Sequence, residues 1–322
     1  MRTIFKAASI GTLALASYQL LAADHPFPVK PVRMVNPYAA GGGTDIVGRA
    51  VGQYLGESWG QPVVIDNRPG AGTTIGTEIV VRAVPDGYTL LLNNGSIATT
   101  AALYRDLSFS PVKDLAPVAA VVQSPYVLAI HPGVSAKSLP EFVHFARTRS
   151  GKVAYGSEGV GSAQFLTMEL FKSIAQINLL HVPYKGGAPT ITALAGGEVQ
   201  AIFGRISNIM PLAKTGRLRA LAITSGKRVD GIDVPTVAEQ GYAGFEALTW
   251  YGVFAPARTP AAIINKINAD INKSLQKSEL RNRFLAQALF SMAGPPETLR
   301  DHLNSEIQRW SKVIADTGVK PE

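Results

Sequence analysis

Cysteine is absent from this chain of 322 residues. Its absence excludes disulfides, thiolate metal ligands, cysteine nucleophiles and the lipidated cysteine that tethers some exported proteins to a membrane. Charge is also sparse, at 17% of the residues, and beyond the N-terminus no apolar run approaches the roughly 20 residues that cross a bilayer. The chain is nevertheless 46% hydrophobic, so it can bury a large core, and its length predicts two domains.

The N-terminus has the pattern of a secretory signal peptide. Arg2 and Lys6 precede a nearly uncharged run over residues 7–22, and the first acidic residue is Asp24. We predict a signal peptide over residues 1–23, and the alternative is an uncleaved N-terminal anchor. Without a cysteine to carry a lipid, the mature chain is expected to be a periplasmic protein that is not lipid-anchored.

The charge balance favours anionic partners. Removal of residues 1–23 takes away two of the 31 basic residues and none of the 23 acidic ones, which leaves 29 against 23 and a net charge of +6. The basic residues are scattered, without a nucleic-acid motif or a basic stripe interleaved with aromatic residues. We therefore expect a small anionic ligand and no nucleic-acid partner.

Short β-rich runs alternate with helical patterns along the chain, which predicts an α/β fold with parallel strands. One clear helix is predicted to begin at Thr259 and another near Pro295, and both carry apolar stripes that are typical of core-facing helices. The predicted strands cover residues 32–35, 62–66, 88–93, 118–130, 152–155, 178–182, 199–203, 218–224 and 249–255.

A glycine-rich turn links the first strand to a helix. Gly41, Gly42 and Gly43 follow residues 32–35 and let the backbone bring bare N–H groups close to a ligand. Thr44 or Asp45 is expected to cap the helix. The first N–H groups of a helix lack internal partners and lie at the positive end of its dipole, so they stabilise a carboxylate or phosphate. The alternative is an ordinary strand-to-helix turn.

A second glycine-rich turn occurs about 120 residues further along the chain. Gly156, Gly159 and Gly161 follow the strand over residues 152–155, and Ser162 is predicted to cap the next helix. Two such units suggest two lobes that present amides and hydroxyls to a shared cleft and close on a ligand by a hinge motion. This inference is an analogy at the level of the fold.

Several motifs in order resemble one family. They are NPYAAGGGTDIVGR, QPVVIDNRPGAGTTIGTEIVVRAVPDGYTLLL, YGSEGVGS, HVPYKGGAPTITALAGGEV, GRLRALAITS and WYGVFAPARTP, and they span nearly all of the mature chain. Together they resemble the Bug receptors, which are the substrate-binding proteins (TctC-like) of tripartite tricarboxylate transporters. The resemblance implies a type II periplasmic-binding-protein fold, in which two Rossmann-like lobes are joined by two crossover strands around a central ligand cleft.

The same resemblance implies a function and a set of ligand-binding residues. It implies no enzymatic activity, no cofactor and no metal. The implied function is capture of a small carboxylate for a membrane permease, and we expect the chain to be a monomer. In that family two glycine-rich loops embrace the ligand carboxylate. The residues carried over are Tyr38, Ala40, Gly42, Thr44 and Asp45 from one lobe and Ser157, Gly159, Gly161 and Ser162 from the other, with Ser96 and Tyr184 as further candidates.

The resemblance also implies a discontinuous first lobe. It would comprise residues 24–124 and 248–322, with residues 125–247 as the second lobe. The chain would cross between lobes near residues 123–126 and again near residues 247–250. The alternative is one continuous sheet with Pro125 at an edge.

Departures from the family pattern bear on the ligand. Phe165 stands where many relatives have histidine, and it is either a core residue or a ring that stacks on the ligand. Gly204 replaces an aspartate that would suit a ligand amine, which argues against amino acids. The adjacent Arg205 either pairs bidentately with a second carboxylate or lies solvated at the surface. We predict a dicarboxylate, with aromatic members such as terephthalate among the candidates.

Competing chemistries lack their motifs. The glycine spacings fit neither a dinucleotide fingerprint nor a phosphate loop, and the residues around Ser157 break the pattern of a hydrolase nucleophile. The five histidines show no zinc-site spacing, and His181 is expected to pack structurally, with ligand contact as the alternative. Two functions remain, a transport receptor and a ligand-gated receptor that presents its closed form to a membrane sensor kinase.

Overall fold

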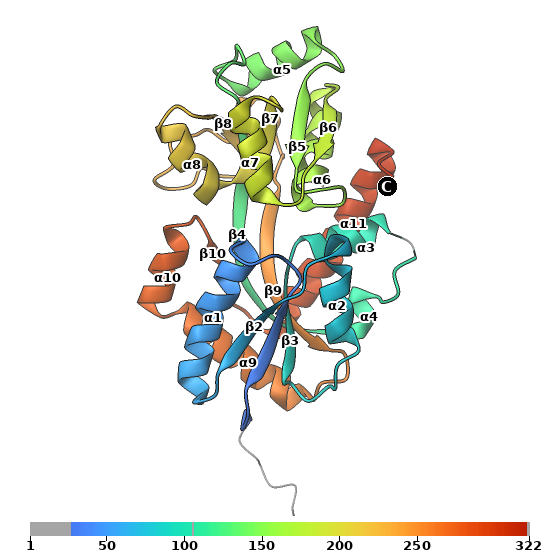
Figure 1. Ribbon diagram of the computed structural model, residues 1–322, viewed down its shortest axis with the longest axis vertical. Coiled ribbons are helices and arrows are strands. Elements are labelled where there is room, and N and C mark those ends of the chain that lie inside the picture. The colour runs from blue at the N-terminus through green and yellow to red at the C-terminus, as the bar shows by residue number, and fades with distance from the viewer. Residues whose placement is uncertain (1–26, 105, 321–322) are drawn as a thin grey trace, which may run out of the picture.

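The computed structural model describes residues 27–104 and 106–320 (Figure 1). The predicted signal peptide lies outside these residues. Strands pair in the order β2-β1-β3-β9-β4-β7-β5-β6, and β8 and β10 both pair with β4. Helices flank these strands in two lobes, drawn one above the other in Figure 1. The predicted α/β class is therefore confirmed.

The first lobe is built on parallel strands that follow the N-terminus. β1 (Val32–Asn36) lies between β2 (Val63–Asn67) and β3 (Thr89–Asn94) and is parallel to both. β3 then pairs antiparallel with β9 (Leu248–Pro256), which pairs with the first part of β4 (Leu115–Ile130). β10 (Phe290–Ser291) adds a short antiparallel pair to β4 and has no counterpart among the predicted strands.

The second lobe repeats this parallel arrangement. β5 (Ala154–Ser157) is parallel to β6 (Leu180–Pro183) and to β7 (Ala201–Arg205). The last part of β4 pairs antiparallel with β7 and with β8 (Arg219–Ile223). All nine predicted strands thus correspond to observed strands, with ends that differ by a few residues.

Long strand β4 runs through both lobes and changes partners along its length. Its last pair with β9 joins Pro125 and Leu248, and its next pair joins Tyr126 to Arg205 of β7. Proline has no N–H to donate to a strand partner. Pro125 therefore suits the place where β4 stops pairing with β9 and begins to pair with β7. The exact lobe boundaries stay a prediction, and this change of partners supports them.

Helices cover both lobes. In the first lobe they are α1 (Gly43–Trp59), α2 (Thr74–Val81), α3 (Ser96–Leu103), α4 (Pro111–Asp114), α9 (Ala261–Leu275) and α10 (Ser278–Leu285), with the 3-10 turn η1 (Ala71–Thr73). In the second lobe they are α5 (Leu139–Thr148), α6 (Ala163–Ala175), α7 (Gly187–Gly196) and α8 (Ile206–Lys214), with the turn η2 (Ala238–Gln240). Helix α11 (Pro296–Thr317) contacts β4 and α3 and also α6 of the second lobe. Among the described residues, no helix has the length and apolar content needed to span a membrane.

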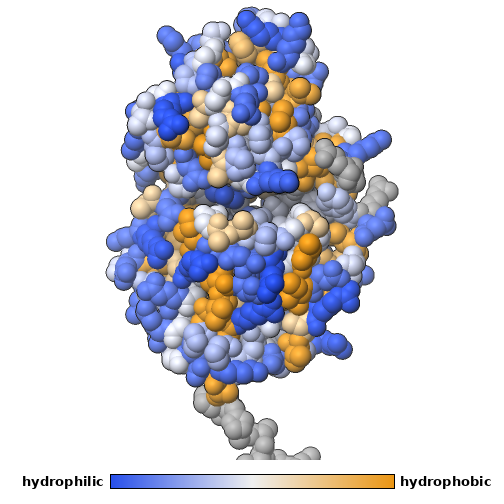
Figure 2. Space-filling view, viewed as in Figure 1, coloured by the Kyte–Doolittle hydropathy of each residue, from blue (hydrophilic) through white to orange (hydrophobic). Residues whose placement is uncertain are grey.

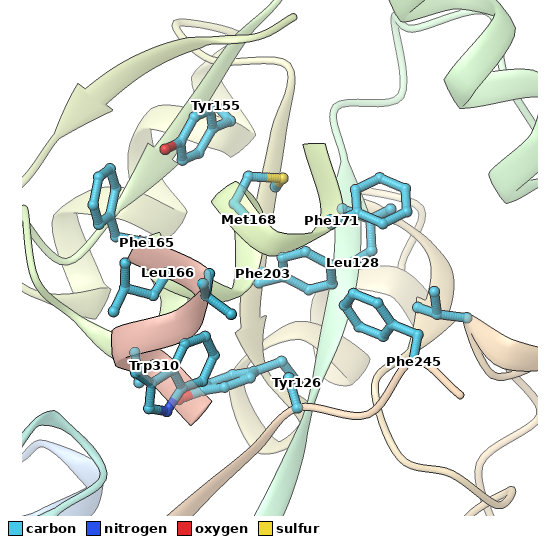
Figure 3. Packing of buried hydrophobic residues seen from close by; sticks show 14 of the residues in the cluster. Tyr126, Leu128, Tyr155, Phe165, Leu166, Met168, Phe171, Phe203, Phe245 and Trp310 are labelled. Atoms are coloured by element: carbon cyan, nitrogen blue, oxygen red, sulfur yellow. The ribbon is translucent and has the colours of Figure 1, made fainter. Parts of the chain in front are cut away.

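The two predicted core-facing helices are confirmed. The α9 stripe formed by Ile264, Ile267 and Ile271 is buried in the first lobe. On α11, Trp310 is buried in a cluster that also contains Phe165 of α6, drawn in Figure 3. Because that cluster joins α11 to α6, the C-terminal helix connects the two lobes through apolar packing.

Candidate functional site

The first glycine-rich loop leaves the start of α1 open. The residue that precedes the helix is Gly42, in an extended conformation, and no side chain of the described residues caps the helix there. The prediction that Thr44 or Asp45 is the cap was wrong, because the helix already begins at Gly43 and both residues lie inside its first turn. The N–H groups of that turn are therefore left for another acceptor, at the positive end of a helix of 17 residues.

Asp45 holds the loop in place. Its Oδ2 accepts hydrogen bonds from the Gly41 amide at 3.0 Å and from Arg49 Nε at 2.9 Å, and its Oδ1 accepts one from Asn67 Nδ2 at 3.0 Å. Burial acts to raise the pKa of Asp45, but these donors outweigh it and the pKa lies below its usual value. Both carboxylate oxygens are thus engaged within the protein, so Asp45 fixes the position of the loop. Ala40 of the same loop is exposed to solvent.

Two asparagines at the end of β3 organise the predicted residues Tyr38, Thr44 and Ser96. The Tyr38 hydroxyl lies 2.6 Å from Asn94 Oδ1, which also accepts from the Ser96 amide at 2.9 Å. Asn94 Nδ2 lies 3.4 Å from Thr44 Oγ1, and the Tyr38 hydroxyl lies 3.2 Å from Asn93 Oδ1. Burial raises the pKa of Tyr38 far above its usual value, so the hydroxyl stays protonated and donates. Sequence reasoning missed both asparagines, although polar residues directly after an apolar strand were a usable signal.

The second loop uses its hydroxyls internally. Ser157 is 1% exposed, and its Oγ lies 2.7 Å from His181 Nε2 and accepts from the Gly159 amide at 3.1 Å. Ser162 caps α6 as predicted, since its Oγ accepts from the Phe165 amide at 3.2 Å. Gly159 and Gly161 have φ of +118° and +78°, so side chains there would be strained. The loop therefore offers backbone groups to a ligand, while its serines maintain its shape.

Helix α3 of the first lobe reaches this second loop. Thr99 Oγ1 donates a hydrogen bond to the Gly161 carbonyl at 2.6 Å, although the two residues are 62 positions apart in the sequence. A Cβ placed on Gly161 would lie 3.2 Å from Leu103 of α3, which shows how closely the two lobes approach here. Figure 2 shows a narrow hollow where the lobes meet.

Three aromatic candidates belong to the second lobe. Phe165 is 6% exposed and belongs to the core, with its ring 4.6 Å from that of His181 (Figure 3 labels Phe165), so the core alternative holds for it. Burial lowers the pKa of His181 to about 4, which keeps the ring neutral at neutral pH. The Tyr184 hydroxyl lies 3.3 Å from Glu198 Oε2 on the same lobe.

Arg205 projects from the second lobe onto the start of α1. Its side chain is only 15% exposed, so the solvated alternative was wrong. A Cβ placed on Gly43 would lie 3.2 Å from Arg205 Nε and 2.7 Å from the Tyr251 hydroxyl. Because Gly43 has no side chain, the guanidinium and the tyrosine hydroxyl can pack directly against the first turn of α1. Arg205 Nε is buried and has no hydrogen-bond partner among the described residues.

Glu158 of the second loop completes the group of charges. Its Oε2 lies 3.4 Å from Arg205 Nη2, and its side chain is 16% exposed. Burial acts to lower the pKa of Arg205, but Glu158 and the neighbouring tyrosines together outweigh it, so the pKa lies above its usual value and the guanidinium stays charged. Sequence reasoning missed Glu158 and Tyr251. The sequence features that could have identified them were an acidic residue inside a glycine-rich loop and a tyrosine in the predicted crossover strand.

Metal chemistry has no support in the described part of the chain, where no three His, Asp or Glu side chains gather in a geometry that could hold an ion. The groups that gather near the start of α1 are instead amides, hydroxyls and one guanidinium. Such a set matches a carboxylate.

Comparison with known proteins shows what kind of protein has this fold. The chain is 38% identical over 299 residues to protein BugT of Bordetella pertussis, with 91% of each chain covered. It superposes on Rpa4515 of R. palustris with adipate at a TM-score of 0.87, with 32% identity over 92% of this chain and 100% of that one. It also superposes on MatC of Rhodopseudomonas palustris with bound malate, at a TM-score of 0.82 and 32% identity over 89% and 100% of the two chains.

The two-lobed α/β fold and its glycine-rich loops define a solute-binding receptor of the periplasmic-binding-protein class. Residues 47–319 match the tripartite tricarboxylate transporter family receptor (TctC), and the chain belongs to that family. The resemblance to Bug receptors is thereby confirmed. The family consists of receptors and not of enzymes.

Proposed function

We propose that this receptor captures a small dicarboxylate between its lobes and delivers it to a tripartite tricarboxylate-type membrane transporter. The observation that carries the proposal is the buried Arg205 guanidinium, whose Nε has no partner among the described residues and faces the first turn of α1. A buried N–H without an acceptor is unfavourable by roughly 1–3 kcal/mol, so this donor favours an incoming anion.

A carboxylate is the anion that fits this geometry. The planar guanidinium binds a carboxylate with two parallel hydrogen bonds, and the uncapped amides of α1 supply further donors at the positive end of the helix dipole. The Tyr251 hydroxyl adds one more polar group beside Gly43. In the proposed complex, Arg205 and the amides at the start of α1 hold one carboxylate together, and the backbone groups of the second loop hold the other.

Two solved relatives support a ligand with two carboxylates. They carry adipate and malate, which are both dicarboxylates of modest size. The core position of Phe165 removes the stacking contact that would favour an aromatic ligand, so terephthalate is one member of the proposed class and not its leading candidate. Delivery to a permease rests on membership of the receptor family.

Calorimetric titration tests the ligand class. We expect malate, adipate or terephthalate to bind at least about tenfold more tightly than acetate, hexanoate or benzoate, and more tightly than glutamate. Arg205→Met should weaken dicarboxylate binding by about thirtyfold or more, because it removes a buried charge partner. Arg228→Met is the matched control, since Arg228 lies 2.9 Å from Glu239 on an exposed surface of the same lobe. Preference for a monoacid or an amino acid would overturn the proposal.

Deletion of the gene tests the transport role. We expect loss of uptake of the bound dicarboxylate, with induction of the corresponding genes unchanged. If induction is lost while uptake is retained, the protein would instead act as the receptor that presents its closed form to a membrane sensor kinase.

A further inference from the structure

A carboxylate of the chain itself partly occupies Arg205. Glu158 Oε2 lies 3.4 Å from Arg205 Nη2, and both side chains are largely buried, at 16% and 15% exposed. A full charge-assisted hydrogen bond between these groups is shorter, at about 2.7–2.9 Å. The pair is therefore close enough to attract electrostatically and too long for a strong hydrogen bond.

The contact places a negative charge beside one binding edge of the guanidinium. Nε and Nη2 lie on the same side of the planar guanidinium, and a carboxylate that binds this edge takes one N–H from each. Glu158 faces Nη2, whereas Nε has no partner among the described residues. A ligand carboxylate that binds this edge would therefore lie beside the Glu158 carboxylate, and repulsion between the two negative charges favours displacement of Glu158.

The surroundings of Glu158 are shaped to admit its carboxylate. A Cβ placed on Gly187, the first residue of α7, would lie 2.7 Å from Glu158 Oε1. Any side chain at that position would push the carboxylate away from its present place. Glu158 also belongs to the second loop, directly before Gly159, and its partial exposure gives it a path toward solvent.

We propose that Glu158 is a specificity-determining residue, an internal carboxylate that pairs with Arg205 in the empty receptor and is displaced by a carboxylate of the ligand. This inference rests on the proposed function. Only a group that binds the guanidinium better than Glu158 can replace it, so neutral amide or alcohol ends are rejected and a bidentate carboxylate is accepted. The competition also weakens binding of the accepted ligand.

Replacement of Glu158 by its neutral isostere tests the inference. With adipate and malate as probes, we expect Glu158→Gln to tighten binding of the dicarboxylate by about tenfold, because the charged competitor is gone. Glu198→Gln is the matched control, since it removes one negative charge from an exposed site of the same lobe and should leave affinity within about twofold. In an Arg205→Met background the gain from Glu158→Gln should vanish.

The outcomes separate the two proposals. If malate, adipate and terephthalate all bind neither wild type nor variant, the proposed dicarboxylate function fails. If they bind the wild type and Glu158→Gln leaves affinity unchanged, the displacement inference fails. Weaker binding by Glu158→Gln would show that Glu158 contacts a donor on the ligand, which also overturns it. Glu158→Ser, which removes the carboxylate altogether, gives the same comparison if the glutamine variant does not fold.

Discussion

At the scale of single residues, the site depends on polar groups that hold the loops as much as on groups that face a ligand. Asp45 is the clearest case, with bonds to the Gly41 amide, Arg49 and Asn67. Asp45→Ala should lower the free energy of unfolding by about 1–3 kcal/mol, since it removes a buried acceptor that three donors share. Ligand affinity should also fall, because the loop before α1 loses its anchor. Chemical denaturation and calorimetry measure the two effects.

An acid in the first turn of another helix provides the control for Asp45. Glu297 lies in the first turn of α11 and is 54% exposed, and its nearest basic partner, Arg300, is 3.9 Å away. Glu297→Ala should change stability by less than about 0.5 kcal/mol and leave binding unchanged. Equal effects of the two substitutions would contradict the assigned role of Asp45.

Individual residues also mark where sequence reasoning succeeds and where it stops. Ser162 could be assigned as a cap because capping depends on neighbours within three residues along the chain. The position of Arg205 could not be settled, since its burial depends on contact with Gly43, which lies in the other lobe. Glu158 was missed for the same reason, because its partner is 47 positions away.

At the scale of elements, the start of α1 is the feature on which the site is built. Its prediction failed only in the identity of the cap, because three successive glycines give no side-chain signal for the first helical residue. The strands were predicted well, since their apolar runs are local, but the two-residue β10 is too short to leave a pattern.

Adding a side chain at Gly43 tests whether the start of α1 binds the ligand. A Cβ there would lie 2.7 Å from the buried Tyr251 hydroxyl and 3.2 Å from Arg205 Nε, so it would push both groups away from the start of α1. Gly43→Ala should therefore weaken dicarboxylate binding by at least about tenfold in a calorimetric titration. Gly56→Ala on the same helix is the control, because its Cβ would meet its nearest neighbour at an ordinary 3.5 Å.

The Gly56→Ala control should keep wild-type affinity and gain up to about 1 kcal/mol in unfolding free energy, as expected for alanine in a helix. If Gly43→Ala binds like wild type, the amides at the start of α1 are not the carboxylate site.

At the scale of the whole molecule, several strands and helices join the lobes. The β4 and β9 strands pass from one sheet toward the other, α11 packs against α6, and α3 meets the second loop. The sequence predicted the strand crossings through family resemblance. It gave no sign of the contacts of α11 with α6 or of Thr99 with Gly161, because these depend on how the lobes close upon each other.

The hydrogen bond from Thr99 to the Gly161 carbonyl is expected to favour the closed arrangement, since its partners separate when the lobes part. Thr99→Val keeps the shape of the side chain and leaves that carbonyl without its donor, which should disfavour closure by about 1 kcal/mol. We expect weaker dicarboxylate binding by about fivefold and a larger radius of gyration for the ligand-free protein in X-ray scattering. Thr167→Val is the matched control, because the buried Thr167 donates to Ala163 within α6 at 2.7 Å and bridges no lobes. Thr167→Val should change stability but neither ligand affinity nor the radius of gyration. If Thr99→Val also leaves the radius of gyration and the affinity unchanged, the contact of Thr99 with Gly161 does not bias closure.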